Sequence, residues 1–146
     1  TFSKIYGLAG LRVGYGVGSP ETIQGIAKIR RAFDVNTQAQ VAALASLDDA
    51  AELERRRRLT AEGRELLVRT LREHGLEPAG PAVANFLFAE VGDDALPLFE
   101  ALLRQGAIVR PLAAFGAPGA LRITVGTPEE NTFFANALAA VRAPTT

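Results

Sequence analysis

The sequence predicts an α/β protein, and two observations support this prediction. After residue 80, short apolar segments and amphipathic segments follow one another in the order strand, helix, strand, strand, helix. Before residue 80, segments with helix caps and helical periodicity dominate. Alternation of this kind is typical of helices that pack on a sheet. We therefore expect a small α/β layer in the second half of the chain and mainly helices in the first half.

The composition is that of a globular protein without a metal centre. The 146 residues are 48% apolar, and 16 basic residues balance 16 acidic ones. This balance argues against a nucleic-acid-binding arm or a polybasic membrane surface, although it does not exclude a local patch. The sequence has no cysteine, one histidine, no signal-peptide pattern and no apolar run of about 18 residues. We expect a cytoplasmic protein without disulfides, metal ions or membrane spans.

The beginning of the chain suggests a fragment of a longer protein. The sequence contains no methionine and starts at Thr1, inside a glycine-rich motif. Residues 1–36 lack enough strands for a sheet of their own. We expect residues 1–50 to end a larger domain and residues 51–146 to form a small C-terminal α/β domain, with the boundary inside a long helix near residues 48–58. Natural processing before Thr1 is the alternative to a fragment.

In the first half, cap residues predict helices after one strand. Alternating apolar residues between Leu11 and Val17 predict the strand. Ser19-Pro20 combines an N-cap residue with proline at the first helical position, so a helix of about a dozen residues should follow. After a non-helical joint at residues 33–36, Thr37 can cap an alanine-rich helix that extends to Leu47.

A longer helix is predicted between Asp49 and His74. Asp49 and Glu52 have the spacing of a capping box, and Gly75 is a typical helix stop. The apolar stripe of this helix consists of Leu59, Leu66, Leu67 and Leu71. His74 is interpreted as a partner of the helix C-terminus.

Four consecutive arginines, Arg55–Arg58, lie inside this long helix. They could form an anion-binding patch. Glu52, Glu54 and Glu62 at helical spacing instead favour an ion-paired, solvated helix face. We therefore expect a solvated face.

The second half contains the predicted α/β layer, after a connection rich in proline and glycine at residues 76–83. The expected elements are a buried strand at 84–89, a helix from Asp93 or Asp94 to Gly106, a strand at 107–111, a loop at 113–119, a strand at 121–125 and a helix from Thr127 to about Val141. The last helix has a cap, a first-turn proline and a capping-box glutamate at residues 127–130. Residues 143–146 are expected to fray.

Lys4 is the residue with the clearest chemical potential. A free lysine amine has a pKa of about 10.4 and is mostly protonated, but burial or neighbouring cations lower that pKa and favour a covalent bond to a carbonyl. The hydroxyls of Thr1 and Ser3 and the guanidinium of Arg12 are suited to a phosphate. Gly7 allows the backbone between them to turn tightly. The alternative is an ordinary surface lysine that precedes a strand.

The segment Thr1–Tyr15 resembles the active-site lysine segment of fold-type I pyridoxal-phosphate aminotransferases, most closely the histidinol-phosphate aminotransferase group. Later segments resemble the same family in the same order: Asn36 with its alanine-rich helix, residues 84–86, residues 109–111 and residues 121–131. The likeness spans essentially the whole chain. It implies the C-terminal part of the fold-type I transferase fold, which comprises the end of the large domain plus the small α/β domain.

This resemblance implies roles for the residues of the lysine segment. Lys4 matches the lysine that bonds covalently to pyridoxal 5'-phosphate and moves a proton between the substrate and the cofactor. Ser3 and Arg12 match residues that hold the cofactor phosphate, and Thr1 is a further candidate. Tyr6 and Tyr15 are interpreted as packing residues near this segment.

The resemblance also implies substrate-binding residues near the other end of the chain. Arg122 matches the arginine that pairs with a substrate carboxylate, and it could serve the phosphate of histidinol phosphate. Arg110 matches an arginine near the distal end of the substrate, and Asn85 helps to position substrate. From the residues alone, Arg122 could equally be an outward residue of a strand and Arg110 a cation at a strand end. Asn85 could satisfy backbone groups.

The function implied by the resemblance is transamination of L-histidinol phosphate with 2-oxoglutarate, in histidine biosynthesis. The partners implied are a small-molecule amino donor, a 2-oxo acid and a second subunit of a homodimer. The family takes an aspartate for the cofactor ring nitrogen from sequence upstream of the lysine, so we expect the isolated chain to be inactive. The alternatives are an aromatic amino-acid (phenylalanine) aminotransferase, a related decarboxylase, and a non-catalytic remnant or interaction module.

Overall fold

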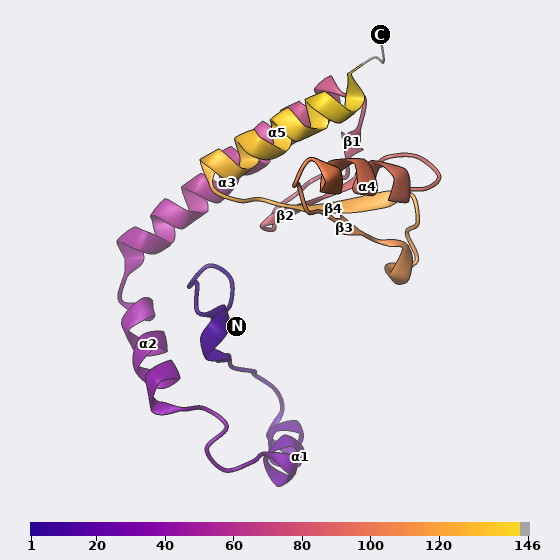
Figure 1. The fold of residues 1–146 in the computed structure, drawn as a ribbon. Helices are drawn as coiled ribbons and strands as arrows, with labels where there is room; N and C mark the ends of the chain where they lie inside the picture. Colours follow the sequence, from indigo (N-terminus) through magenta and orange to yellow (C-terminus); the bar gives the residue numbers. More distant parts are fainter. Residues whose placement is uncertain (144–146) are drawn as a thin grey trace. The chain divides into compact units, whose positions relative to one another are not determined.

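The chain divides into two compact units, Thr1–Arg57 and Arg58–Thr146, and the computed structural model describes residues 1–143 (Figure 1). The long helix α3 (Ala50–Glu73) begins in the first unit and continues into the second. Within the described residues, no helix is long and apolar enough to cross a membrane. The fraying expected for the chain end concerns residues that, apart from Ala143, lie outside this description.

The first unit is helical, as predicted. It contains a short 3-10 helix η1 (Ala9–Leu11), the helices α1 (Pro20–Ile29) and α2 (Thr37–Leu47), and the start of α3. The Ser19 hydroxyl caps α1 by accepting a hydrogen bond from the Thr22 amide at 3.2 Å. The cap of α2 is one residue earlier than expected, because the Asn36 side chain accepts from the Ala39 amide at 2.7 Å. Thr37 is therefore the first helical residue and not the cap.

The strand expected between Leu11 and Val17 is absent from the first unit. Leu11 instead ends η1, and residues 13–19 have no regular secondary structure. The Phe2 amide donates to the Val13 carbonyl at 3.2 Å, but no ladder of hydrogen bonds continues from this pair among the described residues. A strand requires such a ladder with a neighbouring strand, so the alternation of apolar and polar side chains was not sufficient to form a strand here.

Helix α3 begins and ends at the predicted signals. The Asp49 carboxylate accepts from the Glu52 amide at 3.0 Å, which satisfies one of the free amides of the first turn. Gly75, with φ +71°, follows the helix end. His74 Nδ1 lies 2.8 Å from the Thr70 carbonyl oxygen, which supports its interpretation as a partner of the helix C-terminus.

The four-arginine run of α3 is ion-paired, and the predicted solvated face holds for the exposed Arg55, Arg57 and Arg58, whereas Arg56 is half-buried. Arg55 and Arg56 both contact Glu52, with nitrogen–oxygen distances of 2.6 Å. The two following arginines form longer pairs, Arg57 with Glu54 at 4.0 Å and Arg58 with Glu62 at 3.9 Å. Each guanidinium thus lies near a carboxylate three or four residues away, where helix geometry places neighbours.

The second unit contains a four-stranded antiparallel sheet in the order β1-β2-β4-β3. Its strands are β1 (Glu77–Pro78), β2 (Phe86–Glu90), β3 (Arg110–Pro111) and β4 (Ala120–Thr124). The three strands expected from the sequence are present, shifted or shortened at their ends. Strand β1 was not predicted: it lies in the connection expected at residues 76–83 and exists through its pairing with β2.

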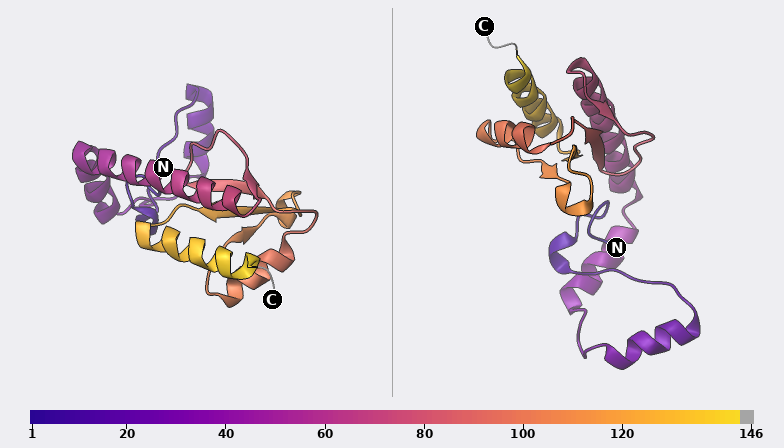
Figure 2. Two further views of the ribbon diagram at one scale, coloured as in Figure 1. Left: turned by 90° about the horizontal axis from the view of Figure 1, so that it is seen from above. Right: turned by 90° about the vertical axis from the view of Figure 1, so that its right-hand side faces the viewer.

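Three helices cover one face of this sheet, as Figures 1 and 2 show. They are the second part of α3, then α4 (Leu96–Arg104) and α5 (Pro128–Arg142). Helix α5 has the predicted capping box, in which Thr127 and Glu130 exchange side-chain to backbone hydrogen bonds. Among the loops, residues 113–119 contain the 3-10 helix η2 (Ala113–Phe115).

The core lies between the helices and the covered face of the sheet. Its largest fully buried side chains are Leu67, Leu71, Leu87, Leu102, Leu121 and Leu138. Buried residues alternate with exposed or half-buried ones along β2 and from Leu121 onward in β4, whereas Ala120 at the start of β4 is also buried. Side chains of a strand alternate between the two faces, so the opposite face of the sheet is not covered by the described helices. That open face carries Arg110 and Arg122.

Candidate active site

Lys4 lies on a tight turn in the first unit, and its side chain is exposed. The Gly7 amide donates to the Lys4 carbonyl at 2.9 Å, and the Leu8 amide donates to the Phe2 carbonyl at 2.9 Å. Gly7 has φ +71°, a left-handed conformation that suits glycine. The turn thus presents the Lys4 amine to solvent from a backbone closed by two hydrogen bonds.

Two of the predicted phosphate ligands meet beside Lys4. The Thr1 hydroxyl donates to the Ser3 hydroxyl oxygen at 2.9 Å, and the Ser3 amide donates to the Thr1 hydroxyl oxygen at 3.2 Å. This pair places two hydroxyl groups and one backbone amide together next to Lys4. Hydroxyl and amide donors of this kind are suited to the oxygens of a phosphate.

Arg12, the third predicted phosphate ligand, follows η1 with an unusual backbone. Its φ of 56° and ψ of 46° lie in the left-handed region, which non-glycine residues rarely adopt. The Arg12 guanidinium donates from Nη1 to the Ala9 carbonyl at 2.7 Å. Such backbone outliers concentrate at functional sites. One of the five guanidinium N–H donors is used here, and the fork retains others for an anion.

Three aromatic side chains of the lysine segment contact one another. Phe2 is 7% exposed, and its ring centroid lies 4.8 Å from that of Tyr6 and 6.2 Å from that of Tyr15. Both distances are typical of attractive aromatic pairs. The interpretation as a packing residue therefore agrees with the structure for Tyr6, which is half-buried, but not for Tyr15, which touches the Phe2 ring at its edge and is 76% exposed.

Arg56 is a further residue of this site, although the sequence pattern indicates only a place on a solvated helix face. Its Nη1 donates to the carbonyl of Ile5, next to Lys4, at 2.9 Å. No local signal marks this contact, because the two residues are 51 positions apart. The only hint in the sequence was the excess of cations in the Arg55–Arg58 run.

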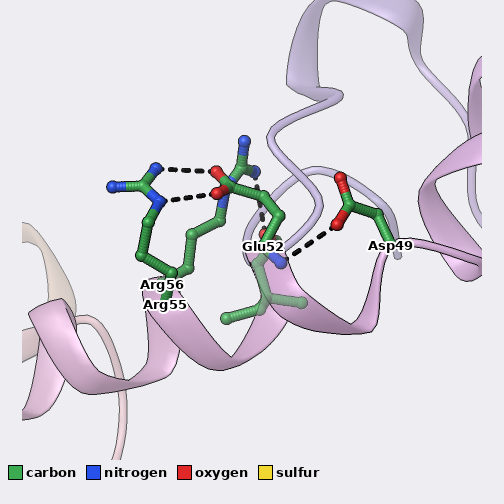
Figure 3. A network of polar contacts seen from close by, with 5 residues as sticks. Asp49, Glu52, Arg55 and Arg56 are labelled. Carbon is green, nitrogen blue, oxygen red and sulfur yellow. Dashed lines mark hydrogen bonds and ion pairs between the residues drawn. The ribbon is translucent and has the colours of Figure 1, made fainter.

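The carboxylate that holds Arg56 has a strongly shifted pKa. Hydrogen bonds from Arg55 and then from Arg56 lower the pKa of Glu52 from 4.5 to about 2 (Figure 3). As Figure 3 shows, both guanidiniums converge on this one carboxylate, while Asp49 accepts at the backbone of the same residue. Glu52 therefore stays ionised in acid in which an ordinary glutamate is protonated.

The second unit holds the predicted substrate-binding arginines. Arg110 on β3 and Arg122 on β4 are directly opposite in the sheet register, and Phe88 on β2 lies opposite Arg122 on its other side. Directly opposed residues share a face, so the two guanidiniums extend from the open face of the sheet. The Arg122 guanidinium carbon lies 5.6 Å from the centre of the Phe86 ring, a cation–π distance.

Neither Arg110 nor Arg122 forms an ion pair with a carboxylate among residues 1–143. Like charges on directly opposed residues destabilise a sheet. An anion that binds both guanidiniums would remove that repulsion. The third predicted substrate residue, Asn85, is exposed, and its backbone carbonyl accepts from the Val125 amide at 2.9 Å.

The structure thus arranges the predicted site residues in two groups. The first unit holds Lys4, the Thr1–Ser3 hydroxyl pair and Arg12 on one loop. The second unit holds the opposed arginines. In the described part of the chain, no group of three or more histidine, cysteine or acidic residues is placed to hold a metal ion. The first unit therefore provides an accessible amine, Lys4, beside hydroxyl and guanidinium groups that can bind an anion.

This combination of a lysine loop and an α/β layer defines a known class of protein. The family model described as aminotransferase class I and II matches residues 1–138. The chain belongs to the class I and II aminotransferase family, whose members depend on pyridoxal 5'-phosphate.

Within this family, the chain is similar to histidinol-phosphate aminotransferases. It is 49% identical to the enzyme of that name from Symbiobacterium thermophilum over 96% of the chain and 38% of the relative. The chain thus spans less than half the length of the curated relatives that it matches.

Solved structures agree on the fold. The histidinol-phosphate aminotransferase of Sinorhizobium meliloti, solved in complex with pyridoxal-5'-phosphate, superposes with a TM-score of 0.80 at 31% identity, over 97% of this chain and 39% of that one. A mutant aspartate aminotransferase of Thermus thermophilus gives 0.81 at 29% identity, over 94% of this chain and 41% of that one. The predicted fold, a part of the pyridoxal-phosphate-dependent transferase fold, is therefore confirmed. Because enzymes with different substrates share this fold, the fold by itself does not select the substrate.

Proposed function

We propose that the chain is the C-terminal part of an aminotransferase that exchanges the amino group between L-histidinol phosphate and 2-oxoglutarate. The observation that carries this proposal is the Lys4 loop, which presents an exposed amine beside the Thr1–Ser3 hydroxyl pair. The similarity to histidinol-phosphate aminotransferases supports the choice of amino donor. In this proposal residues 1–50 end the large cofactor-binding domain and residues 51–146 form the small C-terminal domain.

The residues of the loop fit pyridoxal 5'-phosphate. Ser3, Arg12 and Thr1 would hold its phosphate through hydroxyl and guanidinium donors, and the left-handed backbone of Arg12 fixes where that guanidinium leaves the loop. Lys4 would bond to its aldehyde carbon. When bound, the cofactor supplies an electron sink for the substrate α-carbon.

Lys4 has a second role in this proposal. With the cofactor bound, the Lys4 amine would be the base that takes the proton from the substrate α-carbon and the acid that gives it back. An exposed side chain on a closed turn can make this short movement without a change in the backbone.

Arg122 and Arg110 would bind the anionic end of the substrate, and Asn85 would help to position it. Their opposed register offers two planar donor forks on one face of the sheet. A phosphate, with three oxygens and nearly two charges, can use both forks, whereas a carboxylate uses one. The same face would thus accept histidinol phosphate in one half-reaction and glutamate in the other.

The assignment of the cofactor lysine can be tested by trapping. The full-length protein is mixed with pyridoxal 5'-phosphate, reduced with borohydride and digested for mass spectrometry. We expect the reduced adduct on Lys4, with an absorbance band at roughly 410–430 nm before reduction. Lys4→Ala should abolish both signals. Lys28→Ala, which changes an exposed lysine of α1, is the control and should keep them. An adduct that persists in Lys4→Ala contradicts the assignment.

The chain of residues 1–146 alone is expected to show negligible transamination. It spans 38% of its curated relatives, and the aspartate that the family places on the cofactor ring nitrogen is expected in the remainder. Turnover by this chain alone would contradict that expectation. In the full-length protein, a homodimer in the cytoplasm is the proposed assembly, and its size can be measured by light scattering.

An aromatic amino-acid aminotransferase is the second candidate. It is favoured by the aromatic side chains beside Arg122, since Phe86 stacks on the guanidinium and Phe88 lies opposite it in register. The ratio of kcat/KM for histidinol phosphate to that for phenylalanine separates the two candidates. A preference for phenylalanine of about a hundredfold, which corresponds to about 2.7 kcal/mol in transition-state binding, would replace the first proposal with the second.

A further inference from the structure

Arg56 reaches from helix α3 into the backbone of the lysine loop. Its Nη1 donates to the Ile5 carbonyl at 2.9 Å, and Ile5 directly follows Lys4. A hydrogen bond from a charged donor to a backbone carbonyl is stronger than one between neutral groups. This bond links the loop to a helix 51 positions further along the chain.

Gly7 leaves the space that this contact requires. A Cβ atom at Gly7 would lie 2.6 Å from Arg56 Nη1, closer than real Cβ contacts allow. The guanidinium therefore passes directly over the Gly7 backbone on its way to Ile5. In this turn glycine serves two needs, a left-handed φ of +71° and the close approach of the arginine.

The Arg56 side chain is itself held in place. Its Nε donates to Glu52 Oε1 at 2.6 Å, and the first turn that carries Glu52 is capped by Asp49 (Figure 3). The two guanidiniums lower the pKa of Glu52 to about 2, so this partner stays charged in acid well below pH 4.5. Arg56 thus spans a fixed carboxylate on one side and the loop carbonyl on the other.

Arg55 provides an internal comparison. It binds the same Glu52 carboxylate through two hydrogen bonds, at 2.6 and 2.7 Å. Its side chain is 52% exposed, compared with 35% for Arg56. No hydrogen bond joins Arg55 to the lysine loop in the described residues. The two adjacent arginines therefore share one acidic partner and differ in their contact with Ile5.

We propose that Arg56 is a positioning residue for Lys4, which restricts the lysine loop to the backbone conformation from which the Lys4 amine reaches the cofactor aldehyde. The proposal rests on the proposed function of Lys4. Exposed loops sample many conformations, and each one that is excluded before reaction lowers the entropy cost of bringing the reacting atoms together. In this proposal Arg56 does not touch the reacting atoms and acts through the Ile5 carbonyl.

The first test measures the loop without the cofactor. Hydrogen–deuterium exchange of the Gly7 and Leu8 amides is followed in the full-length, cofactor-free protein, because these amides close the Lys4 turn. We expect exchange to be about tenfold faster in Arg56→Ala, as for the loss of one charge-assisted hydrogen bond. Arg55→Ala should exchange like the unchanged protein.

The second test measures the reactivity of the Lys4 amine toward the cofactor. The rate at which Lys4 forms its covalent linkage, followed by absorbance and by borohydride trapping, should fall about tenfold in Arg56→Ala and remain unchanged in Arg55→Ala. Arg56→Lys is the second variant, for the case in which the alanine variant does not fold. It keeps the charge but has no planar fork to span Glu52 and Ile5, so it should also accelerate exchange and slow the linkage.

The outcomes separate this proposal from the proposed function. Unchanged exchange and linkage rates in folded Arg56→Ala or Arg56→Lys would overturn the role of Arg56. Equal changes of the exchange and linkage rates in Arg55→Ala would also overturn the role of Arg56. They would show that the loss of either arginine partner of Glu52 disturbs the first turn of α3. If Lys4 of the unchanged protein forms no linkage, the proposed function fails, while the exchange measurement still reports whether Arg56 holds the loop.

Discussion

The two units of this chain are stabilised in different ways. The second unit has one continuous apolar core, to which α3, α4, α5 and the sheet all contribute. The first unit buries few apolar side chains among its described residues, namely Phe2, Ala39 and Ala43. Its local shape depends instead on helix caps, tight turns and the Glu52 ion pairs. The proposed catalytic loop therefore lies in the unit with less hydrophobic stabilisation of its own.

The apolar residues of helix α1 illustrate this difference. Ile29 is 83% exposed and Phe33, just after the helix, is 97% exposed. In the second unit, Leu102 and Leu138 are at most 1% exposed. Burial of a large aliphatic side chain contributes about 1.5–3 kcal/mol, so the two sets of residues differ greatly in what they contribute to the described fold.

The largest effect is expected from core truncation in the second unit. Leu138→Ala removes a fully buried side chain and leaves a cavity, so the free energy of unfolding should fall by about 2–5 kcal/mol. The matched change Ile29→Ala in the first unit should alter it by about 0.5 kcal/mol or less. Urea unfolding followed by circular dichroism measures both. Equal losses would show that α1 is buried as deeply as α5 and would break the comparison.

The next largest difference in stability between the two units is expected from alanine substitution of one helical glycine in each, Gly63 and Gly25. A Cβ at Gly63 of α3 would lie 2.6 Å from Val125 Cγ1 and 2.7 Å from Asn131 Nδ2, so Gly63→Ala should destabilise the protein by about 1–3 kcal/mol. A Cβ at Gly25 of α1 would have no neighbouring atom within 4 Å, so Gly25→Ala should stabilise the protein by about 0.5–1 kcal/mol through helix propensity. Thermal melting of both variants is the measurement. A gain in melting temperature for Gly63→Ala would contradict the close packing of this helix.

The smallest expected effect is the pH dependence of stability. In both units an arginine lowers the pKa of a glutamate. Arg55 and Arg56 lower the pKa of Glu52 to about 2, and Arg72 lowers the pKa of Glu77 in the second unit. A carboxylate with a lowered pKa in the folded state contributes stability above its ordinary pKa of 4.5, and that contribution is lost as pH falls toward 2.

Carboxyl NMR titration of the folded protein measures this shift. Glu52 should titrate near pH 2, and its pKa should rise toward 4.5 in Arg55→Ala, because the Arg55 hydrogen bonds are the largest cause. Arg57→Ala is the control, since Arg57 pairs with Glu54 and leaves Glu52 untouched. A Glu52 pKa near 4.5 in the unchanged protein would show that these ion pairs do not persist in solution.

Elements with strong local signals were predictable from the sequence. The caps Ser19, Asp49 and Thr127 each satisfy amides of their own helix, so the information lies within four residues. The strands of the second unit were predicted as well. By contrast, the short strand Glu77–Pro78 exists because β2 lies beside it, and the strand expected near Leu11 is absent where no neighbour pairs with it. Pairing is a tertiary property, so sequence alternation gave one false strand and missed another.

The same distinction holds for the candidate site. The residue types could be read from the sequence: an amine at Lys4 with hydroxyls and a guanidinium close along the chain, in a pattern specific enough to indicate the aminotransferase family. Folding brings Arg110 and Arg122 opposite each other on one face of the sheet, and it brings Arg56, alone of its four-arginine run in the described residues, into a hydrogen bond with the lysine loop. Chemical identity and short spacings are written in the sequence, whereas contacts between distant residues depend on how helices and strands pack.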